Sequence, residues 1–125
     1  MASIRALIVD DSSVMRKIVA RSLRQAGIEL SEVLEAGNGV EALGVLQENQ
    51  VDLILCDINM PVMDGITFIK EARRLAVLRF TPILMLTTES QDSMKMQGKA
   101  AGATGWIVKP FNPEQLLKVL AKVLP

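Results

Sequence analysis

The sequence predicts an α/β protein, a doubly wound three-layer domain built on one five-stranded parallel sheet. Two observations predict it. Short apolar runs alternate with longer helical patterns, and the runs are rich in Ile, Leu and Val, as in parallel strands that helices cover on both faces. The five runs occupy residues 4–9, 32–36, 53–57, 82–87 and 105–108.

Helix start and stop signals support the first two units. Ser12 or Ser13 can cap a helix after the first run, and Gly27 stands where a glycine commonly ends one. After the second run, Asn38 and Glu41 have the spacing of a capping box. Both segments are therefore expected to be helices.

The last three runs are followed by similar signals. Asp64 precedes the third helix, Ser90 opens the fourth and Gly102 ends it. Asn112 can cap the fifth helix, with Pro113 at its first position. This helix extends to the end of the sequence, so we expect residues 1–125 to form one domain.

Composition limits the classes of function. The 125 residues carry 14 basic and 14 acidic side chains, which gives no bias toward nucleic acid or an anionic membrane. Cys56 is the single cysteine, which excludes an internal disulfide and suits a reducing compartment. No apolar run approaches the roughly 20 residues of a membrane span, and no signal peptide is recognisable. We expect a cytoplasmic monomer that binds neither nucleic acid nor membrane.

Polar side chains follow four of the five runs. Asp10 and Asp11 come after the first run, Asp57 closes the third, Thr87 the fourth and Lys109 the fifth. Parallel strands place their carboxyl ends along one edge, where ligands of such sheets bind. We therefore expect three carboxylates, a hydroxyl and an ammonium group to converge.

The three carboxylates predict a cation site. Two carboxylates about 4 Å apart repel by roughly 4 kcal/mol at an effective dielectric constant of 20. Oxygen ligands without His or Cys favour Mg²⁺, which also seeks phosphate oxygens. Capping of the first helix is the alternative role for Asp10 and Asp11, but it leaves Asp57 unexplained.

Lys109 and Thr87 suit an incoming phosphoryl group, because one supplies an ammonium and the other a hydroxyl donor. The alternatives are a solvated lysine and a β-branched residue that ends a strand. Pro110 demands a special turn, and a cis bond before it would aim the Lys109 side chain sharply.

The polar residues lie in four sequence blocks that occur in a fixed order along the chain: VDDSSVMRKIV, DLILCDINMPVMDG, PILMLTTES and GWIVKPFNP. With these blocks, the whole chain resembles the receiver domain of bacterial two-component response regulators. The resemblance implies a flavodoxin-like sandwich with strand order 2-1-3-4-5 and, without an attached output domain, a single-domain chemotaxis regulator.

The resemblance assigns roles at the predicted site. Asp57 would accept a phosphoryl group from a phosphohistidine on a histidine kinase. Asp11 and Asp57 would bind Mg²⁺ directly with the backbone carbonyl of Asn59, and Asp10 would act through water or by holding a ligand. The residues that would bind the phosphoryl oxygens are Lys109 and Thr87.

The resemblance also implies a switch. Family members usually carry Tyr or Phe where this chain has Trp106, and that ring moves inward when the threonine, here Thr87, turns to the phosphate. Trp is larger, and its indole N–H needs a partner when buried. A role as an ordinary core or surface residue is the alternative for Trp106.

Further residues follow from the same resemblance. Asn59 and Glu89 would flank the acyl phosphate and set its lifetime, unless both are ordinary loop residues. The partner surface would comprise the fourth helix, the fifth strand and the fifth helix, with a flagellar motor switch protein as an output partner. Its residues would include Met94, Lys95, Lys99 and Trp106.

Several functional alternatives remain open at this point. The protein could be a signalling switch, a phosphorelay intermediate or a phosphate sink, and none of these is an enzyme beyond its own phosphoryl transfer and dephosphorylation. An aspartate-nucleophile phosphatase of the haloacid dehalogenase type wants a second Asp where Asn59 stands. A flavodoxin-like FMN protein wants a Ser, Thr or Gly phosphate loop where Asp10 and Asp11 stand.

Overall fold

The computed structural model describes residues 3–88 and 92–124, and its elements alternate as the sequence predicts. The strands are β1 (Ile4–Val9), β2 (Leu30–Ala36), β3 (Leu53–Asp57), β4 (Ile83–Thr87) and β5 (Gly105–Val108). The helices are α1 (Ser13–Gln25), α2 (Gly39–Glu48), α3 (Gly65–Ala72), α4 (Asp92–Ala101) and α5 (Pro113–Val123), with a 3₁₀ turn, η1 (Ala76–Leu78), before β4.

All five strands are parallel and lie in the order β2-β1-β3-β4-β5, so the predicted fold class and strand order are confirmed. Val9 is paired with Cys56, and Thr87 with Val108. This register brings the carboxyl ends of β1, β3, β4 and β5 to one edge of the sheet.

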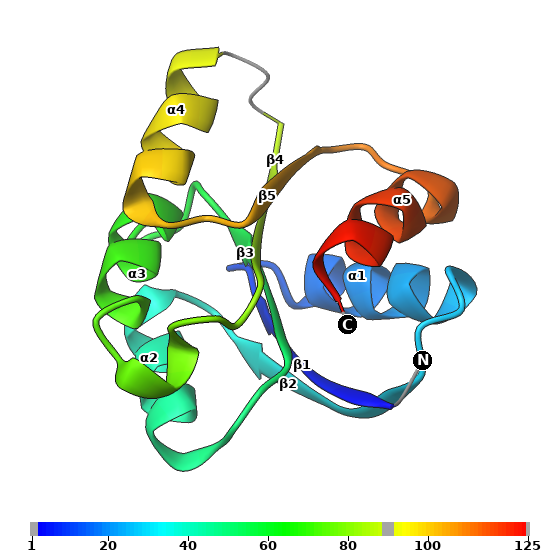
Figure 1. Cartoon of the computed structure of the whole chain (residues 1–125), viewed down its shortest axis with the longest axis horizontal. Helices are drawn as coiled ribbons and strands as arrows, with labels where there is room; N and C mark the ends of the chain where they lie inside the picture. The colour runs from blue at the N-terminus through cyan, green and yellow to red at the C-terminus, as the bar shows by residue number, and fades with distance from the viewer. Residues whose placement is uncertain (1–2, 89–91, 125) are drawn as a thin grey trace.

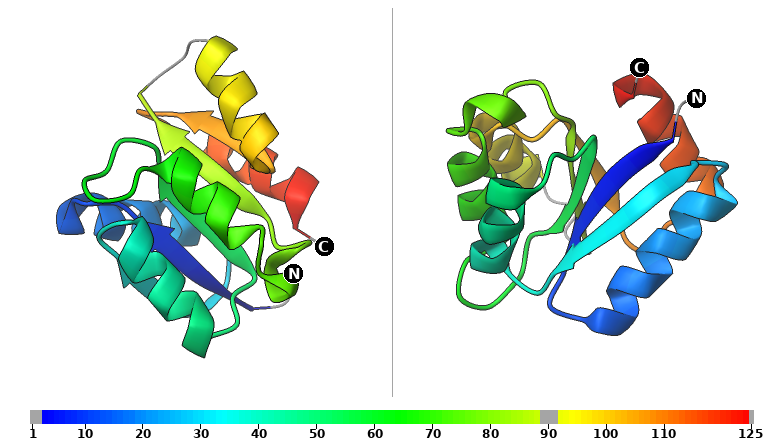
Figure 2. Two further views of the ribbon diagram at one scale, coloured as in Figure 1. Left: turned by 90° about the vertical axis from the view of Figure 1, so that its left-hand side faces the viewer. Right: turned by 90° about the horizontal axis from the view of Figure 1, so that it is seen from below.

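Helices cover both faces of the sheet. Figure 1 shows α1 and α5 on one side and α2, α3 and α4 on the other. Successive strand residues point to opposite faces, so β1 contributes to two cores. Leu7 and Val9 pack in the core under α2 and α3, whereas Ala6 and Ile8 pack under α1 and α5. Figure 2 shows these layers from two further directions.

Four of the predicted helix starts are confirmed by the capping contacts. The side-chain oxygens of Ser12, Asn38 and Asp64 accept backbone N–H groups in the first turns of α1, α2 and α3. Asn112 forms a full capping box with Gln115. The predicted start at Ser90 lies outside the described residues.

Two strand boundaries differ from the sequence prediction. β2 starts at Leu30, two residues early, because Leu30 pairs with Ile4 across a register irregularity. β4 starts at Ile83, one residue late, because Pro82 has no N–H to donate to the sheet. No described helix has both the length and the apolar character of a membrane span.

Candidate functional site

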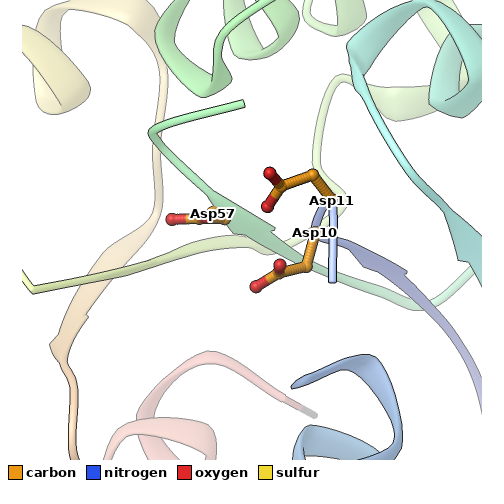
Figure 3. A group of neighbouring side chains, drawn as sticks. All are labelled: Asp10, Asp11 and Asp57. Atoms are coloured by element: carbon orange, nitrogen blue, oxygen red, sulfur yellow. The ribbon is translucent and has the colours of Figure 1, made fainter. Parts of the chain in front are cut away.

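The predicted carboxylates do meet at the carboxyl edge of the sheet. Asp10 and Asp11 follow β1, and Asp57 is the last residue of neighbouring β3. Figure 3 shows their side chains pointing to a common side. One oxygen of each carboxylate lies within 4.8 Å of the other two, which is close enough for one cation to contact all three.

Lys109 lies at the same site, as predicted. Its Nζ lies 3.4 Å from Oδ2 of Asp10 and 3.8 Å from Oδ1 of Asp57. The Lys109–Pro110 peptide bond is cis, and the backbone N–H of Lys109 donates to the carbonyl of Thr87 at 2.7 Å. One ammonium group faces three carboxylates, so the cluster keeps an excess of negative charge.

Local hydrogen bonds hold Asp10 in place, and Asp10 is only 4% exposed. Its Oδ1 accepts the backbone N–H of Ser12 at 2.9 Å. Its own N–H donates to the carbonyl of Ala36, and its carbonyl accepts from the Arg16 guanidinium. Asp11, in contrast, is exposed. The cluster therefore has one fixed carboxylate and one that faces solvent.

Burial raises the pKa of Asp57 above its usual value, and the Asp10 carboxylate raises it further. Lys109 and the backbone N–H groups of Asn59 and Ile58 act in the opposite direction but do not offset the increase. Asp57 is therefore costly to ionise in the metal-free site, and a nearby cation would reduce this cost.

The arrangement has the groups that a phosphoryl-accepting site needs: a carboxylate nucleophile, further oxygen ligands for a cation, and an ammonium group. Comparison with known proteins agrees. Residues 6–121 match the family model described as the response regulator receiver domain. The chain belongs to this family.

Relatives and solved structures resemble this receiver domain over nearly its whole length. It is 40% identical to a chemotaxis protein CheY homolog of Campylobacter jejuni, with 96% of this chain and 92% of the relative covered. The structure of the chemotaxis response regulator CheY4 of Vibrio cholerae superposes with a TM-score of 0.87 at 50% identity, covering 98% and 100% of the two chains.

A second similar structure is the receiver domain of the sensor histidine kinase PA1611 from Pseudomonas aeruginosa, described with a magnesium ion coordinated in its active site cleft. It is 27% identical with a TM-score of 0.84, and 98% of each chain is covered. The present chain is thus a phosphorylation-activated two-component response regulator, homologous to CheY and distinct from classical enzymes. The phosphatase and FMN-protein alternatives are set aside.

Sequence reasoning missed the role of Gly65 in this receiver domain. Its N–H donates to the carbonyl of Ile58 at 2.8 Å and closes the loop that follows Asp57. A Cβ atom at this position would collide with the backbone carbonyl of Asp57. The Asp64-Gly65 pair at the start of α3 was visible in the sequence, but the close approach was not.

The two predicted switch residues lie on the neighbouring strands β4 and β5. Thr87 is fully buried at the end of β4, and Trp106 is half-buried on β5. The indole ring packs beside Gly98 of α4. The expected partner of the indole N–H is not found: among the described residues no acceptor reaches this buried group.

The other predicted residues are only partly placed. Asn59 is exposed beside Asp57, and Glu89 lies outside the described residues. Met94 is half-buried, whereas Met96, two residues further along α4, is 71% exposed. Residues of α4 and β5 line a surface hollow of about 330 Å³, and they include Lys95, Lys99 and Trp106.

Proposed function

We propose that Asp57 is the phosphoacceptor and that it takes its phosphoryl group from a phosphohistidine on a histidine kinase. The observation that supports this most strongly is the position of Asp57 at the carboxyl edge of the sheet, beside two carboxylates and Lys109. An Asp57 oxygen would attack phosphorus, so that a P–O bond forms as the P–N bond to histidine breaks. The imidazole leaves with the electron pair of that bond.

Mg²⁺ is the cation that this donor set fits best, because every candidate ligand is an oxygen atom. Asp11 and Asp57 would bind it directly with the backbone carbonyl of Asn59, while Asp10 would act through water. When bound, the ion neutralises negative charge on the carboxylates and on the transferring phosphoryl group. The magnesium described in the Pseudomonas receiver domain supports this choice.

Lys109 and Thr87 would bind the oxygens of the phosphoryl group. Lys109 now lies near two carboxylates, and the more negative acyl phosphate would compete for its ammonium group. Thr87 lies at the end of the neighbouring strand, and its hydroxyl would donate to the phosphoryl group after a side-chain rotation. Asn59 and Glu89 would set the lifetime of the acyl phosphate.

The output surface would be formed by α4, β5 and α5. Rotation of Thr87 would let Trp106 move inward and reshape the hollow lined by Lys95 and Lys99. The exposed side of α4, which includes Met96, would then meet a partner. The names of the chemotaxis relatives support a chemotaxis role. The output partner would then be a flagellar motor switch protein. A relay or sink would instead pass the group to a second histidine.

Trp106 is the single tryptophan, so its fluorescence reports on this switch. Beryllofluoride mimics the acyl phosphate, and adding it at a fixed Mg²⁺ concentration should shift the emission spectrum. Asp57→Asn should abolish the shift because the mimic loses its attachment point. Thr87→Ala should bind the mimic but show a smaller shift, since the donor that couples the site to Trp106 is gone.

The Mg²⁺ concentration must be the same in all samples, because the ion alone can change the fluorescence of Trp106. Amide shifts of α4 and β5 should follow the fluorescence in the original chain. If neither changes while the mimic demonstrably binds, the proposed coupling through Thr87 and Trp106 is wrong. A full response in Asp57→Asn would instead place the phosphoacceptor elsewhere.

A further inference from the structure

The loop that follows Asp57 contains a strained residue at the rim of the site. The loop begins at Ile58, and the Gly65 N–H closes it with a 2.8 Å hydrogen bond to the Ile58 carbonyl. Near its middle, Val62 has a φ of +70° and is 81% exposed. Across the described part of the chain, it is the only residue other than glycine with a positive φ.

This conformation is unfavourable for valine. The N–H of Met63 donates to the carbonyl of Pro61 at 2.8 Å, which makes a three-residue γ-turn centred on Val62. The form with positive φ at the central residue is rare and strained. A β-branched residue makes it worse, because its crowded Cβ clashes with the backbone in this region. Local preference therefore does not explain valine here.

Contacts on both sides hold the turn in this shape. The Met63 side chain lies over Gly39, where an added Cβ would come within 2.8 Å of Met63 Cγ. The carbonyl of Met63 also accepts the N–H of Gly39 at 3.4 Å. The turn is thus fixed against the start of α2, and Val62 points into solvent. Its side chain gains too little packing within the domain to offset the strain.

Two other exposed valines lie on segments at the same edge of the sheet as Val62. Val40, directly after Gly39, is 52% exposed, and Val14 in the first turn of α1 is 67% exposed. All three valines stand on segments that follow the carboxyl ends of strands, and Asp57 is itself the last residue of β3. We call Val14, Val40 and Val62 the apolar rim. A protein that brings a phosphohistidine to Asp57 must cover part of this edge.

We propose that Val62 is a docking residue for the domain that carries the phosphohistidine, held outward by the strained turn. This inference rests on the proposed function of Asp57. On such a partner we expect apolar side chains around the phosphohistidine, which would contact the apolar rim. Strained conformations persist where the surrounding structure enforces them and cluster at functional sites. A small phosphodonor would not touch Val62.

Val62→Gly and Val62→Ile provide the test. Glycine relieves the strain and removes the side chain, whereas isoleucine keeps both strain and apolar surface. Each variant is phosphorylated with acetyl phosphate and, separately, with a phosphorylated histidine phosphotransfer domain that labels the original chain. Val62→Gly should lower the rate with the protein donor about fivefold or more, as for loss of a central interface side chain. Val62→Ile should keep that rate.

Two further readouts distinguish docking from a folding defect. The midpoint of thermal unfolding of Val62→Gly should be unchanged or higher by about 2–4 °C, because strain is removed. Its rate with acetyl phosphate should stay within about twofold of the original, given that no group of the cation site is altered.

Unchanged transfer from the protein donor would overturn the docking role of Val62. An equal loss with both donors would also overturn it, because Val62 would then act on the chemistry at Asp57. Failure of the original chain to be labelled by either donor would count against the proposed function itself.

Discussion

Asp57→Asn should raise the midpoint of thermal unfolding in metal-free buffer at neutral pH. The side chain of Asp57 is only 12% exposed, and Asp10 and Asp11 lie beside it, so its ionised form is unfavourable in the folded state. Asparagine keeps the shape and removes the charge. An increase of several degrees is expected, since about 1 kcal/mol moves the midpoint of a domain of this size by about 4 °C.

The effect should depend on pH with a definite sign. The pKa of Asp57 is raised in the folded protein above the ordinary aspartate value of 3.8. Below pH 3.8 the carboxyl is protonated in both the folded and the unfolded chain, so it does not make the free energy of unfolding depend on pH. As the pH rises through the folded pKa, the folded state must lose a proton that it holds more tightly, so stability decreases. The advantage of Asp57→Asn should therefore grow with pH.

Unfolding curves of both proteins between about pH 4 and 8 test this linkage. Glu48→Gln is a matched control, because it removes an exposed carboxylate at the end of α2. The midpoint of unfolding of Glu48→Gln should change with pH in the same way as that of the original chain. Added Mg²⁺ should stabilise the original chain more than Asp57→Asn, because a ligand of the folded state adds stability by mass action. A less stable Asp57→Asn at neutral pH would mean that attraction to Lys109 outweighs the repulsion.

Gly65→Ala should be strongly destabilising, by about 2–3 kcal/mol, as for an overpacked site that cannot relax cheaply. The new Cβ would collide with the backbone carbonyl of Asp57, and neither strand β3 nor helix α3 can move without breaking its contacts. Displacement of Asp57 should also slow its phosphorylation. Urea unfolding measures the first effect and acetyl phosphate labelling the second.

Gly44→Ala is the control for this substitution. Gly44 lies inside α2, where an added Cβ meets nothing within 4 Å. Alanine there should stabilise the protein by about 0.5–1 kcal/mol, because glycine is the poorer helix former. Equal stability of Gly65→Ala and the original chain would show that the loop after Asp57 is not fixed by close packing.

The main features of the site could be predicted from sequence because parallel strands share one edge. Asp10, Asp57 and Lys109 each lie at or directly after the end of an apolar run, so finding the runs was enough to bring them together. The cis bond at Pro110 was also accessible, because proline is the residue before which such bonds occur. The apolar runs, the proline and the rule that parallel strands share one carboxyl edge were enough to predict these features.

Features that depend on long-range packing could not be predicted in this way. The turn at Val62 contradicts the local preference of valine and exists because Met63 packs against Gly39. Arg73 likewise joins segments that are far apart in the sequence: its guanidinium donates to the carbonyls of Leu78 and Thr81 near η1 and to that of Gly102 after α4. No sequence period marks these contacts.

The central claim is that Asp57 becomes phosphorylated in a cation-dependent reaction. Intact-mass spectrometry after treatment with acetyl phosphate and Mg²⁺ tests it most directly. The original chain should gain the mass of one phosphoryl group, and this gain should be absent with EDTA and absent in Asp57→Asn. A phosphoryl group that persists in Asp57→Asn, or that forms equally well in EDTA, would contradict the account.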